Sequence, residues 1–178
     1  MSLIDIVHEL NAGKMPTVIL IGNGVTAAIE PLGEAVDLFS EVIRFNHGVL
    51  QMSGREESIG TTTTTWVLNE DMDGEIRPKG LMSMIRILPD GYDDRFHADA
   101  IIKRELEGVP FPSSGAVMAS SLLQQGLTIF TLGMDGYAKG QRNWWQDDST
   151  PKRQHDSDLE MRFWRENREN IIPLRTMV

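Results

Sequence analysis

The sequence predicts an α/β protein whose mostly parallel, Rossmann-like sheet is flanked by helices. Two observations support this prediction. Short apolar runs recur at 17–21, 41–45 and 127–132, and glycine turns followed by helical spacing of apolar residues separate them. Such alternation favours crossovers between parallel strands. Ligands bind at the carboxyl ends of strands in these sheets, so we expect a site at 22–26 and 112–115.

The N-terminal half is expected to begin with a helix at 3–10, which Gly13 ends. The β-branched run at 17–21 predicts a buried strand, followed by a glycine turn and a short helix near Ala27 to Ile29. Further strands are expected at 41–45, 64–68 and 84–88.

The C-terminal half is expected to continue with a helix at 96–106, because Ile101, Ile102 and Leu106 share one helical face. Ser113 or Ser114 is expected to cap a helix over about 116–125. The remaining expected features are a stop at Gly126, a strand at 127–132, and a helix from Asp156 or Ser157 to about 167, before Pro173.

Composition limits the function classes. The 178 residues carry a net charge of −9, which argues against nucleic-acid binding and docking on anionic membranes. The absence of cysteine excludes disulfides and thiolate chemistry. Neither a signal peptide nor an apolar run long enough for a bilayer is evident. We therefore expect one domain over 1–178, in the cytoplasm, with no convincing metal cluster.

The turn Gly22-Asn23-Gly24 directly follows a predicted strand. It is either a tight strand-to-helix turn or a phosphate-binding loop, since glycines let backbone N–H groups approach an anion. At the next strand end, Arg44 is placed to accommodate the 2′-phosphate of NADP. Alternatively, the amides of Asn23 and Asn46, at neighbouring strand ends, both reach one phosphate.

Two further segments carry candidate chemistry. Ser113, Ser114 and Gly115 either start a helix or offer hydroxyl and N–H groups to a phosphate or sugar carboxylate. His155 is followed by Glu160 and an amphipathic helix. Its imidazole titrates near neutrality, so it suits the role of a base that accepts a hydroxyl proton.

Taken in order, these segments resemble three motifs of the sialyltransferase family. The matching stretches are 18–24 with Gly33, Asp37 and 42–46; Pro112-Ser113-Ser114-Gly115 through Gly133; and His155 with Glu160. The run of threonines after Ile59-Gly60 also resembles a family segment.

The resemblance implies a variant of the GT-A glycosyltransferase fold and an inverting, metal-independent transferase without a cofactor. Its donor would be a CMP-activated sugar and its acceptor a glycan or other hydroxyl compound. By resemblance, His155 is the catalytic base, and Asn23 and Asn46 stabilise the departing phosphate. Gly22, Gly24, Ser113, Ser114 and Gly115 contact the donor, and Gly133 lies against the cytosine.

The sequence also departs from the family. Gly24 replaces a serine, and Asn143 stands where a second histidine that assists the leaving phosphate is expected. The missing histidine leaves a non-catalytic CMP-binding module as an alternative. The loose Gly22-x-Gly24-x-x-Ala27 pattern with Arg44 leaves an NADP-binding reductase as another.

Overall fold

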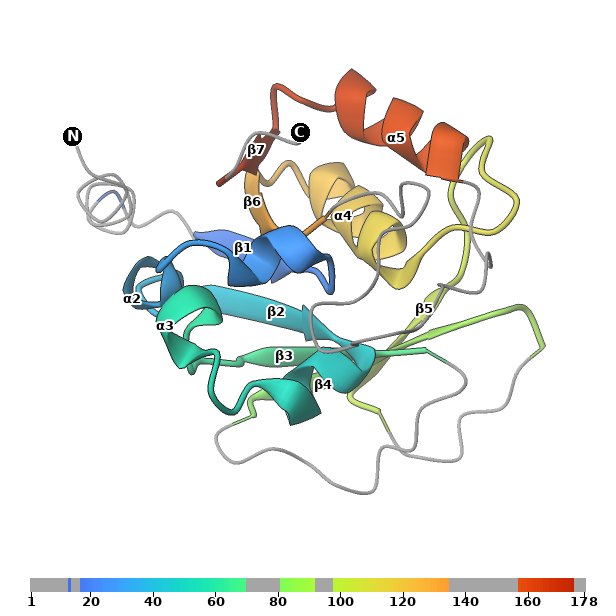
Figure 1. Ribbon diagram of the computed structural model, residues 1–178. Coiled ribbons are helices and arrows are strands. Elements are labelled where there is room, and N and C mark those ends of the chain that lie inside the picture. Colours follow the sequence, from blue (N-terminus) through green and yellow to red (C-terminus); the bar gives the residue numbers. More distant parts are fainter. Residues whose placement is uncertain (1–12, 14–16, 70–80, 92–97, 135–156, 175–178) are drawn as a thin grey trace.

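The protein folds around one seven-stranded parallel sheet with helices on both faces, as seen in the computed structural model (Figure 1). The structure describes residues 13, 17–69, 81–91, 98–134 and 157–174. The strand order is β5-β4-β3-β2-β1-β6-β7, and every neighbouring pair is parallel. The predicted α/β, Rossmann-like fold class is thereby confirmed.

The strands are short, and most are buried on both faces. Their bounds are β1 Val18–Ile21, β2 Glu41–Phe45, β3 Thr65–Leu68, β4 Ser83–Leu88, β5 Ala100–Lys103, β6 Ile129–Leu132 and β7 Ile171–Pro173. Burial on both faces explains why the central strands read as continuous apolar runs.

The helices connect the strands and cover the sheet. Their bounds are η1 Val25–Ala28, α2 Gly33–Val36, η2 Asn46–Gln51, α3 Glu56–Ile59, α4 Ser114–Gln124 and α5 Ser157–Glu166. Gly126, with a φ of 76°, follows the end of α4 as predicted.

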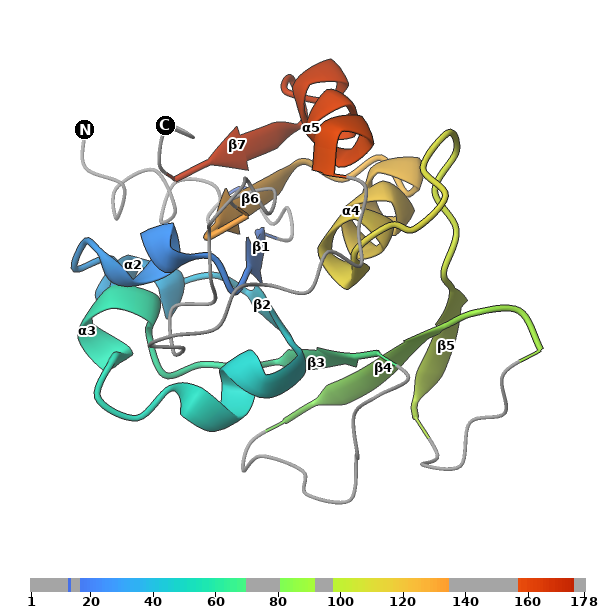
Figure 2. The ribbon, with the colours of Figure 1, turned by 45° about the vertical axis from the view of Figure 1, so that its right-hand side comes forward.

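Two apolar layers separate the sheet from its helices. Leu20 and Ile43 face a cluster that includes Val117 of α4 and Trp164 of α5. The residues beside them in the strands, Ile19, Ile21 and Val42, face the other way and pack against η1, α2 and α3. Figure 2 shows α4 and α5 on one side of the sheet and α2 and α3 on the other. The result is a three-layer α/β architecture.

The chain changes direction across the sheet at β1. From β1 the chain adds β2, β3, β4 and β5 in turn on one side of the sheet. The connection through α4 then leads back to β6, which pairs with β1 on its other side. The carboxyl edge between β1 and β6 is therefore the topological switch point, where open α/β sheets bind ligands.

Two elements of the sheet differ from the sequence-based expectation. The predicted helix over 96–106 is wrong, because Ala100–Lys103 forms the edge strand β5, with Ile101 57% exposed. The short edge strand β7 was not predicted, because Pro173 at its end is unfavourable in most strands. Proline is tolerated at an edge because one side of the strand lacks a partner. The expected helix at 3–10 lies outside the described residues.

Candidate functional site

Asn23 and Asn46 lie at the same level of the sheet. Ile21 pairs with Arg44 in the parallel register of β1 and β2, and each asparagine follows two residues later. The Asn23 Nδ2 donates to the carbonyl oxygen of Phe45 at 3.4 Å, immediately before Asn46. The two asparagines are therefore neighbours at the carboxyl edge, as expected.

Gly22 and Gly133 meet at the ends of β1 and β6. A methyl group built on Gly22 would lie 2.3 Å from the carbonyl oxygen of Gly133. A methyl group on Gly133, which has a φ of +68°, would lie 2.6 Å from the Cβ of Ala27. We call Gly22, Gly24 and Gly133 the glycine corner. Only glycine fits the approach of Gly22 and Gly133 without moving the backbone.

Two amide hydrogens of the glycine corner, those of Gly22 and Gly24, are used within the fold. Gly22 N–H donates to the Leu132 carbonyl at 2.7 Å, and Gly24 N–H donates to the Gly133 carbonyl at 2.9 Å. The following helix η1 is a four-residue 3₁₀ turn, too short to sum a useful helix dipole. The glycines therefore permit close approach, and the asparagine amides are the better donors for an anion.

Met134 joins the glycine corner to the start of α4. Its sulfur would lie 2.9 Å from a methyl group on Gly22 and 3.1 Å from one on Gly115. Gly115 and Gly22 are more than ninety residues apart in the chain, yet they contact the same side chain. Two of the three predicted site segments thus converge at the switch point.

Ser113 and Ser114 differ in what they can offer a ligand. The Glu160 carboxylate accepts from the Ser113 hydroxyl at 2.7 Å and from its backbone N–H, and the Ser113 oxygen accepts from Ala116 N–H at 3.2 Å. Ser114 is also a buried residue, but its hydroxyl is not engaged by Glu160 or by Ala116. Ser113 is thus the helix cap, and Ser114 is the freer hydroxyl. Glu160, which belongs to the predicted His155 segment, thus contacts the predicted Ser113 segment.

The side chain of Arg44 points into the protein interior rather than toward the carboxyl edge of the sheet. Its guanidinium is buried and donates to the carbonyls of Ile59 and Thr62. Burial lowers the pKa of Arg44 to about 10, and the carboxylate of Asp37 opposes this shift. The side chain stays charged at neutral pH but is committed to the 59–62 segment. The suggestion that Arg44 accommodates an NADP 2′-phosphate is therefore wrong.

Asp37 organises the same segment from the other side. Its carboxylate accepts from the N–H groups of Thr61 and Thr62 and from the Thr61 hydroxyl, at 2.8–2.9 Å. Partial burial raises the pKa of Asp37, but these hydrogen bonds outweigh it, so the pKa lies below its ordinary value. The glycine and threonine segment at 59–62 is thus held in place by Asp37 and Arg44.

Asn69 is a polar residue at the carboxyl edge that the sequence analysis did not select. It directly follows β3, and its backbone N–H donates to the Oδ1 of Asn46 at 2.9 Å. Trp66 Nε1 donates to the Asn46 carbonyl at 2.9 Å. These bonds fix Asn46 in a left-handed conformation, with a φ of 47°. A polar residue immediately after a predicted strand was the available signal.

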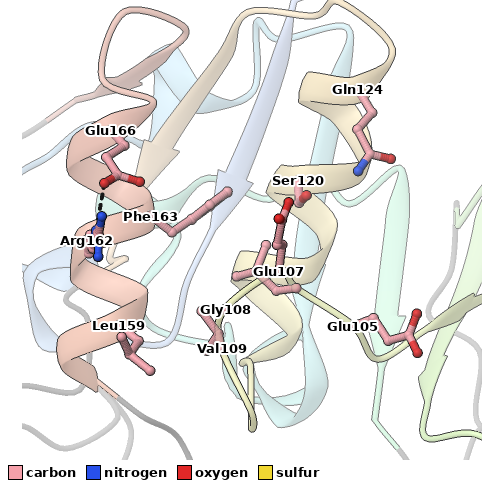
Figure 3. A pocket seen from close by; sticks show the side chains of 11 residues that line it. Glu105, Glu107, Gly108, Val109, Ser120, Gln124, Leu159, Arg162, Phe163 and Glu166 are labelled. Atoms are coloured by element: carbon pink, nitrogen blue, oxygen red, sulfur yellow. Dashed lines mark hydrogen bonds and ion pairs between the residues drawn. The ribbon is translucent and has the colours of Figure 1, made fainter.

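A separate pocket of about 590 Å³ lies beside α4 and α5 (Figure 3). Glu105, Glu107 and Glu166 are among its lining residues, and Phe163 points toward its interior. None of the predicted site residues lines it. Carboxylates would repel a phosphate group, so this pocket is not a suitable place for a nucleotide.

His155 and Asn143 lie outside the described residues. Within the described ranges, no group of three His, Asp or Glu side chains is arranged to hold a metal ion. The expected metal independence stays a prediction. No helix in the described part of the chain has the length and apolarity needed to cross a membrane.

The architecture is similar to solved glycosyltransferase structures. A crystal structure of a mammalian sialyltransferase superposes with a TM-score of 0.65 at 17% identity, covering 94% of this chain and 72% of the other. A mammalian sialyltransferase in complex with Gal-β-1-3GalNAc-ortho-nitrophenol gives 0.62 at 16% identity, with the same coverage. The fold is sialyltransferase-like. No protein family model and no curated protein sequence match the chain.

Proposed function

We propose that the protein is an inverting glycosyltransferase that transfers a sialic-acid-like sugar from CMP to a hydroxyl acceptor. One observation carries the proposal: the carboxyl edge around β1 brings together the two asparagines, the glycine corner and the start of α4. These are the segments whose order along the chain resembles the sialyltransferase motifs. The sialyltransferase-like fold supports the same conclusion.

Neutral amides suit an anionic donor. Asn23 and Asn46 each carry an NH₂ group, and the Asn46 Nδ2 donates no hydrogen bond among the described residues. As the bond between sugar and phosphate breaks, negative charge grows on the phosphate, and fixed amide donors stabilise it. The Ser114 hydroxyl is a further donor at the start of α4.

His155 is assigned as the base by its resemblance to the family motif. The acceptor hydroxyl attacks the anomeric carbon, its proton passes to the imidazole, and the bond from that carbon to the phosphate oxygen breaks. CMP leaves with the electron pair of that bond. Attack from the face opposite the leaving group inverts the configuration.

The proposal is tested by incubating wild type and His155→Ala with CMP-sialic acid and a panel of β-galactosides. We expect turnover by the wild type and a loss of at least about a hundredfold in the variant. Equal rates would remove His155 from the reaction. Asn143, in place of the family histidine, favours one alternative, a CMP-binding module without transfer. Nucleotide binding in calorimetry without turnover would favour that alternative.

A further inference from the structure

Asn69 extends the row of amides along the carboxyl edge of the sheet. Asn23, Asn46 and Asn69 follow β1, β2 and β3, which are adjacent strands. The Asn46 Oδ1 accepts from the Asn69 N–H at 2.9 Å, so the second and third members are in direct contact. Neighbouring strands are about 4.8 Å apart, which places Asn69 roughly 10 Å from the end of β1.

The side-chain oxygen of Asn69 lacks a hydrogen bond. This Oδ1 atom is shielded from solvent and has no partner among the described residues. The nearby Trp66 Nε1 is already committed to the Asn46 carbonyl. Buried polar atoms are nearly always paired, and an unpaired one is found where a ligand or an ordered water completes the bond.

The chemistry of the missing partner is restricted. A carbonyl oxygen only accepts, so its partner must be a donor. The phosphate of a nucleotide sugar is ionised and cannot donate. The cytosine, and with it the attached ribose and its hydroxyl groups, is expected near Gly133, on the far side of β1 from Asn69. The remaining candidates are the hydroxyl groups of the transferred sugar and of the acceptor, which would extend beyond Asn46 and donate to the Asn69 Oδ1.

We propose that Asn69 is a specificity-determining residue whose side-chain oxygen accepts a hydrogen bond from a substrate hydroxyl, on the donor sugar or on the acceptor. The inference rests on the proposed transferase function. It adds a third asparagine to the site and assigns to it the sugar end of the ligand, whereas Asn23 and Asn46 serve the phosphate.

Calorimetry with CMP and with CMP-sialic acid, and steady-state kinetics with a β-galactoside, test the assignment in wild type and Asn69→Ala. We expect unchanged CMP affinity and a three- to tenfold loss, roughly one neutral hydrogen bond, either in CMP-sialic acid affinity or in acceptor KM. The first result assigns the hydroxyl to the donor sugar and the second to the acceptor. Asn69→Asp, which keeps an accepting oxygen, is expected to lose less than Asn69→Ala.

Asn167→Ala is the matched control, since the Asn167 amide donates to the Phe163 carbonyl at the end of α5, away from the carboxyl edge. It should leave all three constants unchanged. Equal losses for CMP and CMP-sialic acid in Asn69→Ala, or no loss at all, would overturn the inference and leave the proposed function standing. An absence of CMP binding in the wild type would overturn both. Thermal unfolding of each variant confirms that the folded protein is being titrated.

Discussion

The Glu160 carboxylate of α5 receives both hydrogen bonds that Ser113 donates at the start of α4. Both residues are buried, and they are 47 positions apart in the chain. A carboxylate at a helix N-terminus also interacts favourably with the helix dipole. Glu160 therefore links α5 to α4, and it holds the start of α4, with Ser114 and Gly115, in position beside the glycine corner.

Replacing Glu160 by alanine should lower the free energy of unfolding by about 2 to 3 kcal/mol. The substitution leaves the buried N–H and hydroxyl of Ser113 without their acceptor, and hydrogen bonds to charged groups are the stronger ones. Urea unfolding at neutral pH measures the change. Glu166→Ala is the control, because Glu166 forms an exposed pair with Arg162 on the same helix and should cost less than about 1 kcal/mol. Equal costs for the two variants would contradict the structural role of Glu160.

Replacing Gly133 by alanine should cost more than the same change at Gly126. Both glycines have left-handed backbone, with φ values of +68° and +76°, so both variants bear a similar strain of about 1 to 2 kcal/mol. The space around them differs: a methyl group meets Ala27 at 2.6 Å in the first case and nothing within 4 Å in the second. Overpacking should add about 1 to 3 kcal/mol to the cost at Gly133. Urea midpoints that coincide would show that the corner yields without strain.

Acid should remove a contribution that Asp37 makes to stability. The folded-state pKa of Asp37 lies below its ordinary value, so the stabilisation is complete above about pH 4 and is lost as the pH falls through the lowered value. Asp37→Asn cannot ionise. The difference in unfolding free energy between wild type and this variant should be constant from pH 7 to about pH 5 and shrink below about pH 4. A difference that is independent of pH would contradict the lowered pKa.

The buried parallel strands were predictable because their local pattern reflects their environment. The run 18–21 is apolar throughout, and 129–132 is apolar except for Thr131, since both faces of the sheet are covered. The edge strand β5 gave no such signal, because three of its four residues are exposed. The spacing of Ile101, Ile102 and Leu106 therefore matched that of a helical face. The segment forms a strand because its backbone pairs with β4.

The candidate site was predictable in its parts but not in its connections. Asn23, Asn46 and the serines were recognised because they follow strands or start a helix. The sequence could not indicate that Arg44 turns inward to the carbonyls of Ile59 and Thr62, since arginine at a strand end is equally suited to a phosphate. Nor could it link Ser113 to Glu160, because that contact depends on how α5 packs on α4.

Asn46→Asp should separate ligand binding from folding. The aspartate keeps an oxygen that accepts from the Asn69 N–H, so the free energy of unfolding should change by less than about 1 kcal/mol. It loses the NH₂ group and places a negative charge where we propose the phosphate binds. CMP affinity should therefore fall at least about tenfold in calorimetry, because one charge-assisted hydrogen bond becomes a repulsion. Asn167→Asp, at the end of α5, should bind CMP as the wild type does. Wild-type affinity in Asn46→Asp would remove Asn46 from the phosphate site, whatever its contribution to the fold.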